Sequence, residues 1–240
     1  MSTYETKLQG REDVAEGTMA FHFEKPQGFV FKPGQTIDLI LPAPPDGDAQ
    51  SARHTFSIVS APCEGDLTIA TRMRDSAFKR ALKALPIGAA IRFEGPFGSL
   101  TLHGNRARAA VLIAGGIGIT PFVSILRQAA HDQLPQSLVL LYSNRRPEDA
   151  AFLAELQALE GRNKNFRLLA TMTEPGKSAR SWTGASGRID DALLRRIGSE
   201  LATPIYYLAG PPALVEAMRK NLSLAGVDDD DIRSEEFYGY

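Results

Sequence analysis

One stretch, residues 111–121, constrains the fold of this chain more than any other part of its sequence. Its apolar run, Val111–Ala114, has the length and composition of a buried strand. Three glycines then interrupt any regular repeat: Gly115, Gly116 and Gly118. Thr120 suits the cap of a helix and Pro121 its first turn, where a missing N–H costs nothing. The stretch therefore predicts a strand, a glycine-rich turn and the start of a helix.

This order of elements favours a phosphate site, because a helix N-terminus offers unpaired N–H groups and a positive dipole end. A tight turn without a ligand is the alternative. A P-loop requires Gly-Lys-Ser/Thr, which the turn lacks. The usual dinucleotide fingerprint has a third glycine where Pro121 stands and an acidic residue about twenty positions later. Here residues 143–146 read Ser-Asn-Arg-Arg, so the turn indicates a nucleotide site of another kind.

The composition narrows the class of protein. The chain has 240 residues, 43% hydrophobic and 23% charged, with a net charge of −1, which gives no reason to expect nucleic acid or a membrane as partner. No apolar run is long enough to span a membrane, and the N-terminus lacks the apolar core of a signal peptide. Cys63 is the single cysteine, and the four histidines lack metal-ligand spacing. We expect a cytoplasmic enzyme with no internal disulfide, cysteine-ligated cluster or metal site.

Residues 1–103 have the pattern of a small barrel. Alternating apolar and polar residues predict strands at 37–41, 55–59, 67–71 and 90–94. Glycine and proline mark the turns between them, at 32–34, 44–47, 64–66 and 95–98. One helix, capped by Ser76 and ending at Pro86, interrupts the strands. Several short strands with regular turns are typical of a closed antiparallel β-barrel.

After the small polar segment 104–110, strands alternate with helices. Strands are expected at 111–115, 137–142, 166–172, 205–209 and near Ile232, and helices at 121–131, 147–160, 190–198 and 212–224. This alternation predicts an α/β doubly wound domain, a parallel sheet with helices on both faces, whose ligands bind at the carboxyl ends of the strands. The chain is therefore expected to divide into two domains, residues 1–104 and 105–240.

Several short motifs follow one another along the chain. They are Pro33-Gly34-Gln35, Phe56-Ser57, Gly95-Pro96-Phe97-Gly98, the turn at 115–121, Gly210-Pro211-Pro212 and the C-terminal residues 235–240. In this order and over nearly the whole chain, they resemble the ferredoxin–NADP reductase family. The resemblance implies a flavin-binding barrel followed by an NAD(P)-binding domain. It also implies an oxidoreductase in which hydride passes from NAD(P)H to flavin N5 and the electrons then pass to a separate acceptor.

The resemblance assigns residues to the flavin. Phe56 would lie against the flavin ring, with a core aromatic residue as the alternative, and Ser57 would form a hydrogen bond near N5. The family motif has an arginine two residues before the aromatic one, where this chain has His54. Either Arg53 reaches the flavin phosphate or His54 contacts it more weakly, and Arg53 is preferred here. Thr55 belongs to the same cofactor-binding strand.

The flavin pyrophosphate is expected at the N-terminus of the helix that follows this barrel strand. Arg72 ends the preceding strand and Ser76 begins the helix, a placement that the helix dipole also favours. Ser76 as a simple helix cap is compatible with this role. We expect FAD rather than FMN, because most stand-alone members of the family use FAD.

The second half of the site would hold the nicotinamide nucleotide. Thr120 is expected close to the nicotinamide, and the three glycines of its turn would let the backbone approach the phosphates. Gly210 and Pro211 form a second turn, preceded by Ala209 where the family often has a cysteine. Phe237 would shield the flavin face where nicotinamide stacks, with Tyr240 as the alternative.

Ser143, Arg145 and Arg146 bear on the choice between NADPH and NADH. Arginine and hydroxyl donors suit a 2′-phosphate, whereas a bare ribose is usually bound by an acidic residue. The basic pair therefore favours NADPH, and the alternative is a solvated pair ahead of the next helix. Arg180 and Arg188 are weaker candidates for the same role.

Three functions follow from these motifs. In the first, Ser57, Thr120 and Phe237 form the catalytic set of a reductase whose electrons go to ferredoxin, flavodoxin, another small redox protein or an oxygenase component. The second is a reductase of free flavin or of a small molecule, and the third is a flavin-binding electron-transfer or sensor subunit without turnover of its own. Three basic residues of one expected helix, Lys79, Arg80 and Lys83, offer a weak docking face for an acidic carrier.

Overall fold

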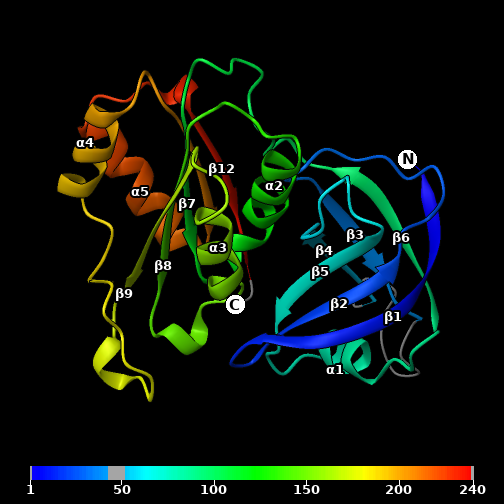
Figure 1. The fold of residues 1–240 in the computed structure, drawn as a ribbon. Helices are drawn as coiled ribbons and strands as arrows, with labels where there is room; N and C mark the ends of the chain where they lie inside the picture. Colours follow the sequence, from blue (N-terminus) through cyan, green and yellow to red (C-terminus); the bar gives the residue numbers. More distant parts are fainter. Residues whose placement is uncertain (1, 43–51, 239–240) are drawn as a thin grey trace.

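The N-terminal part of the chain forms one antiparallel sheet. The structure, a computed structural model, describes residues 2–42 and 52–238 (Figure 1). The six strands are β1 (Thr3–Ala15), β2 (Thr18–Glu24), β3 (Thr36–Ile40), β4 (Arg53–Ser57), β5 (Asp66–Arg72) and β6 (Ala90–Phe97). They lie in the order β4-β3-β6-β1-β2-β5, and α1 (Ala77–Ala84) connects β5 to β6. The expected turn at 44–47 lies outside the described residues.

The sheet closes on itself because its two outer strands meet. Just beyond β4, Ile58 forms an antiparallel bridge with Ile69 of β5, and the Val59 N–H donates to the Thr68 carbonyl at 2.8 Å. Apolar side chains fill the interior, including Phe21, Phe23, Ile37, Leu39 and Phe93, each fully buried. The predicted antiparallel barrel is thereby confirmed.

The strands β1 and β2 did not appear in the sequence-based expectation. Most side chains of β1 are exposed or half-buried, so its sequence shows little apolar alternation. Its pairing with both β2 and β6 holds it in the sheet instead. Long-range backbone hydrogen bonds, which leave little trace in a local pattern, therefore decide this part of the fold.

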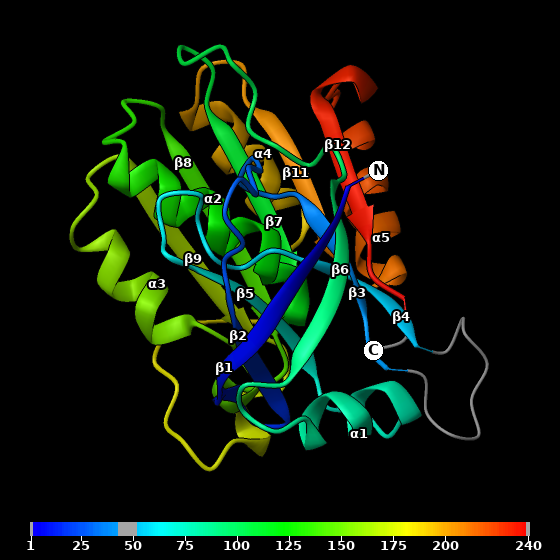
Figure 2. The same ribbon diagram turned by 90° about the vertical axis from the view of Figure 1, so that its right-hand side faces the viewer.

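The C-terminal part forms a parallel sheet of six strands. These are β7 (Ala110–Gly115), β8 (Leu138–Asn144), β9 (Phe166–Met172), β10 (Ala185–Ser186), β11 (Ile205–Gly210) and β12 (Ile232–Glu236), in the order β10-β9-β8-β7-β11-β12. The helices α2 (Thr120–His131) and α3 (Leu153–Glu160) cover one face, and α4 (Asp191–Glu200) and α5 (Pro212–Leu224) cover the other (Figures 1 and 2). The predicted α/β doubly wound fold is thereby confirmed.

One predicted helix, 147–160, is wrong in its first half. The structure has a 3-10 turn at Pro147–Asp149, and α3 begins only at Leu153, after Phe152 adopts the left-handed conformation at φ 61°. The Ala151 carbonyl accepts a hydrogen bond from the buried Tyr142 hydroxyl instead of taking part in a helix. Tertiary contacts thus override an otherwise helical pattern.

The face covered by α2 and α3 also meets the barrel. On α2, Ser124 donates to the Ser60 carbonyl at 2.7 Å, and Arg127 forms ion pairs with Glu64 of the barrel and Glu155 of α3. The C-terminal strand β12 lies beyond β11, next to the end of the barrel (Figure 2). Across the described residues, no helix is both long and apolar enough to cross a membrane.

Candidate functional site

A cavity of about 260 Å³ lies where the two sheets meet. The barrel contributes His54, Thr55, Phe56 and Ser57 of β4, and the α/β part contributes Thr120 and the C-terminal residues 235–238. Six of the residues expected at the site from sequence therefore come together here. They are His54, Thr55, Phe56, Ser57, Thr120 and Phe237.

Ser57 gives this cavity its most unusual feature. Its side chain is 6% exposed, yet its hydroxyl has no hydrogen-bond partner among the described residues. The position is fixed by the backbone, because Ser57 pairs with Thr36 of β3 and the next residue, Ile58, donates to the Gln35 carbonyl at 2.9 Å. A buried hydroxyl without a partner costs stability, which is typical of an atom that a ligand satisfies.

His54 and Phe56 share the side of β4 that faces α1. The His54 ring lies 4.3 Å from that of Phe78 in α1, and the Phe56 ring lies 5.8 Å from Phe78. Burial, together with the charge of Lys79, lowers the pKa of His54 and keeps its ring neutral near pH 7. Ser76 caps α1 as predicted, since its hydroxyl accepts from the Lys79 N–H at 3.2 Å.

Arg53 does not line this cavity. Its guanidinium donates to Asp38 of β3 at 2.6 Å and to Glu94 of β6 at 2.7 Å, and these hydrogen bonds raise its pKa. The side chain therefore serves an ion-pair cluster on the barrel. Arg72 likewise meets a carboxylate, that of Asp149 in the other half of the molecule, at 3.5 Å.

The glycine-rich turn starts its helix earlier than expected. Residues Gly116–Ile119 form a 3-10 turn that continues into α2. The expectation that Thr120 caps the helix is wrong, because its hydroxyl donates to the Ile117 carbonyl at 3.0 Å and Ile119 holds the cap position. Pro121 occupies the first turn as predicted. The N–H groups at the start of the helix, which no side chain caps, are therefore those of residues 116–118.

Glycine is required at two positions of this turn for different physical reasons. A Cβ at Gly118 would lie 2.3 Å from the Ala209 carbonyl oxygen, so the turn after β7 packs directly on the backbone of β11. Gly116 has φ +54° and open space where its Cβ would point. At position 118 only glycine fits without a clash. At position 116 the open space leaves the backbone accessible to a ligand.

The turn at Gly210-Pro211 connects this region to the C-terminus. The Phe237 N–H donates to the Gly210 carbonyl at 2.9 Å, and the Phe237 side chain is 8% exposed at the cavity. Main-chain pairing thus brings an aromatic residue from the end of the chain to the barrel strand β4. Tyr240, the alternative to Phe237, lies outside the described residues.

Glu235 is a cavity residue that sequence reasoning missed as an individual residue. Burial raises its pKa to about 7, from the ordinary 4.5. It also lines a second cavity, of about 550 Å³, together with Arg233 and Gly98. A carboxyl group poised near neutrality between two cavities is suited to proton exchange. Only its place in the C-terminal motif could have indicated it.

The carboxyl ends of the parallel strands form the other part of the site. Gly115 of β7 lies in register with Ser143 of β8, and Ser143 with Thr171 of β9. Arg145 is exposed just beyond Ser143. Arg146 differs from it, because its guanidinium is bound by Asp149 at 2.9 Å and by Glu16 of the barrel hairpin at 3.0 Å.

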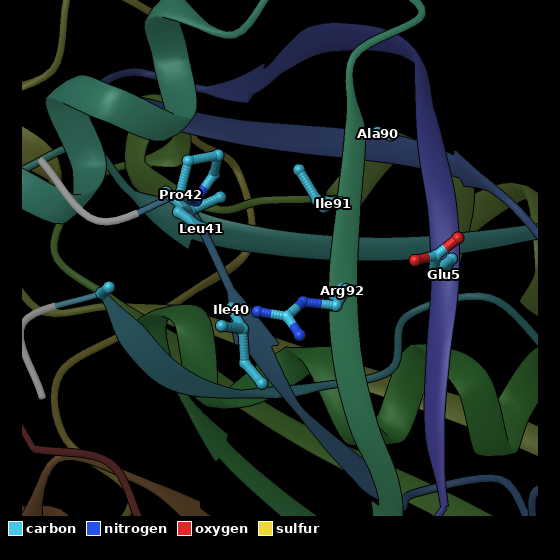
Figure 3. Close-up of a pocket in the computed structure, with 8 residues that line it drawn as sticks. Glu5, Ile40, Leu41, Pro42, Ala90, Ile91 and Arg92 are labelled. Atoms are coloured by element: carbon cyan, nitrogen blue, oxygen red, sulfur yellow. The ribbon is translucent and has the colours of Figure 1, made fainter. Parts of the chain in front are cut away.

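Another cavity, of about 430 Å³, lies on the barrel and holds none of the expected site residues (Figure 3). It is lined mainly by apolar residues, with Glu5 and Arg92 as its charged members. In the close-up, Arg92 reaches from β6 toward Ile40 of β3. This cavity is separate from the junction of the two sheets.

Comparison with known proteins identifies the second half of the chain. A family model described as an oxidoreductase NAD-binding domain matches residues 112–220. The chain is 29% identical over 228 residues to ferredoxin–NADP reductase B of Sorangium cellulosum, covering 90% of each chain. It is 28% identical over 222 residues to the glycine betaine monooxygenase reductase subunit of Chromohalobacter salexigens, covering 92% of this chain and 60% of that one. The chain thus spans about three fifths of the length of the latter relative.

A solved structure shows the same fold over both halves. It is a ferredoxin–NADP⁺ reductase from Neisseria gonorrhoeae with bound FAD and NADP, with a TM-score of 0.78 and 22% identity, and 98% of each chain is covered. In that protein, FAD and NADP are bound together by a barrel followed by a parallel sheet.

Proposed function

We propose that the chain is a member of the ferredoxin–NADP reductase family, and that it oxidises NAD(P)H and passes the electrons, through a bound flavin, to a separate protein acceptor. The observation that carries the proposal is the cavity between the sheets, where the unpartnered hydroxyl of Ser57 meets Thr120 and Phe237. Its two walls come from the two parts of the chain, which we propose divide near residue 104 into a flavin domain and a nucleotide domain.

The residues at the cavity fit a flavin. A planar heteroaromatic ring bearing hydrogen-bond acceptors would satisfy the Ser57 hydroxyl and pack on Phe56. We propose that His54, rather than Arg53, stands nearest the flavin phosphates, because His54 lines the cavity and packs on α1 while Arg53 is held by two carboxylates. The N-terminus of α1 would accept the pyrophosphate of FAD. The redox chemistry comes from the bound flavin, which the protein orients.

The nucleotide would bind along the carboxyl edge of the parallel sheet. The uncapped N–H groups of the turn at 116–118 suit its phosphates, and Gly116 leaves space for them. Phe237 covers the cavity, so we propose that its ring occupies the place that nicotinamide takes during turnover. Thr120 lines the cavity, and its hydroxyl is held by the hydrogen bond that it donates to the Ile117 carbonyl.

We propose NADPH as the preferred donor, and the preference rests on Arg145. Since Arg146 is already neutralised by Asp149 and Glu16, it is not available for a 2′-phosphate, and Arg145 with Ser143 remains. We expect Arg145→Ala to lower the ratio of kcat/KM for NADPH over that for NADH about tenfold, through loss of a charge-assisted hydrogen bond. Steady-state kinetics with both nucleotides measure this ratio. Arg162→Ala, at the end of α3, is the control, and an unchanged ratio in R145A would contradict the assignment.

Glu235 predicts a pH dependence. Its pKa of about 7 means that the carboxyl is neutral below pH 7 and ionised above it. We expect the rate of NADPH oxidation to change near pH 7 in the native protein and to lose this inflection in Glu235→Gln.

Because the pKa is raised on folding, the stability contribution of the neutral carboxyl is full below pH 4.5 and is lost as pH rises through 7. E235Q should therefore be the more stable protein above pH 7, whereas the exposed Glu236→Gln should keep the inflection.

The visible spectrum tests the proposed function. The purified protein, reconstituted with FAD or FMN, should show a flavin spectrum that bleaches under anaerobic NADPH. A protein that takes up neither flavin would exclude the proposal. Flavin uptake without bleaching by NADPH or NADH would instead indicate a subunit without turnover of its own.

The acceptor is proposed from the relatives. An oxygenase component or a small redox protein such as ferredoxin or flavodoxin is the expected class, as the relatives are reductase components of oxygenases and a ferredoxin reductase. Turnover with free FMN or a dye but with no protein carrier would favour the alternative, a reductase of small molecules.

We propose a cytoplasmic location for the protein, because its single cysteine, Cys63, gives no sign of a disulfide framework.

A further inference from the structure

The turn at residues 146–149 contacts three separate parts of the molecule. It follows β8, whose carboxyl end carries Ser143 and Arg145. Its side chains and backbone also meet the β1–β2 hairpin of the barrel and the loop that follows β9. The end of β8 is therefore linked to both the barrel and this loop.

The contact with the barrel is made of charge and backbone together. Asp149, whose side chain is 9% exposed, receives two hydrogen bonds from Arg146, at 2.9 and 3.1 Å, and lies 3.5 Å from Arg72 of β5. Although burial raises the pKa of Asp149, the two arginines lower it below its usual range, so the carboxylate stays ionised. On the other side, the Glu16 N–H of the barrel hairpin donates to the Glu148 carbonyl at 2.8 Å.

The contact with the loop is made by the Glu148 carboxylate. It accepts the Ser178 hydroxyl at 2.8 Å, the Ala179 N–H at 2.8 Å and the Arg180 N–H at 3.3 Å. The Glu148 N–H and these donors lower the pKa of the carboxyl to about 2, so it remains an acceptor across the physiological range. Upstream, the Glu174 N–H donates to the Arg145 carbonyl at 2.8 Å. Residues 174–180 are thereby attached along the end of β8.

We propose that the turn at 146–149 is a joint through which the barrel sets the position of the loop 174–182 at the nucleotide edge, with Glu148 and Asp149 as positioning residues. The inference rests on the proposed function for its effect on NADPH. The joint itself is a property of the protein without nucleotide. As a consequence, the positions of Arg145 and Arg180 around the adenosine end of the nucleotide depend on the position of the barrel relative to the parallel sheet.

The chain carries a built-in probe for this loop. Trp182 is the single tryptophan, and its indole N–H donates to the Ala185 carbonyl at 2.7 Å. Its ring packs against the apolar core that the barrel shares with α2 and α3. Quenching of its fluorescence by acrylamide therefore reports the loop directly, with no need for turnover.

The test compares Glu148→Ala and Asp149→Asn with Glu24→Gln, a change of an exposed side chain at the end of β2 that removes none of the contacts above. In E148A we expect about a twofold rise in the Trp182 quenching constant, and about a tenfold rise in KM for NADPH with kcat within twofold, as loss of hydrogen bonds to a charged group implies. D149N should change both quantities in the same direction, and E24Q should change neither. Thermal unfolding shows whether each variant is folded.

Should D149N fail to fold, Glu16→Gln takes its place. This variant weakens the exposed ion pair between Glu16 and Arg146 and is expected to raise the Trp182 quenching constant. An unchanged quenching constant in E148A, or an effect in E148A that neither D149N nor E16Q shares, overturns the joint. If the wild-type protein does not oxidise NAD(P)H, the proposed function fails, whereas the quenching comparison still decides the joint.

Discussion

Replacing Ser57 by alanine is expected to slow the reduction of the bound flavin by NADPH about a hundredfold, the usual effect of losing one preorganised donor at a reacting centre. The Ser57 hydroxyl is buried at the cavity and has no partner among the described residues, so its proton is available to a ligand. Stopped-flow absorbance under anaerobic conditions measures the rate directly. The flavin should remain bound, because the barrel is unaffected.

Two variants separate this role from a structural one. Ser57→Thr keeps the hydroxyl and should recover most of the rate. Ser60→Ala removes a buried hydroxyl that accepts from the Thr68 N–H at 2.9 Å, so it should lower thermal stability and leave the rate of flavin reduction nearly unchanged. A rate in S57A equal to that of the wild type would show that the unpartnered hydroxyl does not serve the reaction.

Substitution of Gly118 by alanine is expected to cost about 3 kcal/mol of folding free energy, at the upper end of the usual cost of overpacking a core. Its Cβ would lie 2.3 Å from the Ala209 carbonyl oxygen and 2.5 Å from the carbonyl carbon, and neither backbone atom can move without displacing β11. Thermal unfolding should show a loss of roughly 10 °C in Tm or a failure to accumulate as folded protein.

Gly116→Ala is the matched control two residues earlier. Its Cβ meets open space, and the cost is confined to the left-handed φ of +54°, about 1 kcal/mol. We expect G116A to fold and to bind NADPH more weakly, because its methyl group enters the space proposed for the phosphates. Equal stability of the two variants would refute the close packing of the two turns.

Of the residues expected at the site, most of those on the barrel strand and Phe237 in the C-terminal tail meet at one cavity, whereas Arg146 at the nucleotide edge is ion-paired with two carboxylates. The pattern at Phe56-Ser57 lies on the regular strand β4, whose register is defined by its pairing with β3. Arg146 was expected to serve the nucleotide because the local sequence shows only its charge. In the fold its guanidinium is held by Asp149, three residues later, and by Glu16, which is distant in sequence.

The broken helix at 147–152 has the same origin. Local propensity favours a continuous helix there, and the Tyr142 hydroxyl, buried beneath it, takes the Ala151 carbonyl away from the helical ladder. Glu235 was missed as an individual residue for a related reason, because burial between two cavities, not residue type, raises its pKa.

What the sequence determined by itself was the order of the two folds, a barrel and then an α/β series, and the glycine where the backbone must approach closely. These features depend on local periodicity and backbone freedom. Only the tertiary structure decided which charges are free to meet a ligand. Arg53, Arg72 and Arg146 each meet a carboxylate that is distant in the sequence, and the Ser57 hydroxyl has no partner among the described residues. Pairing of charges depends on distances across the fold, which a linear pattern does not contain.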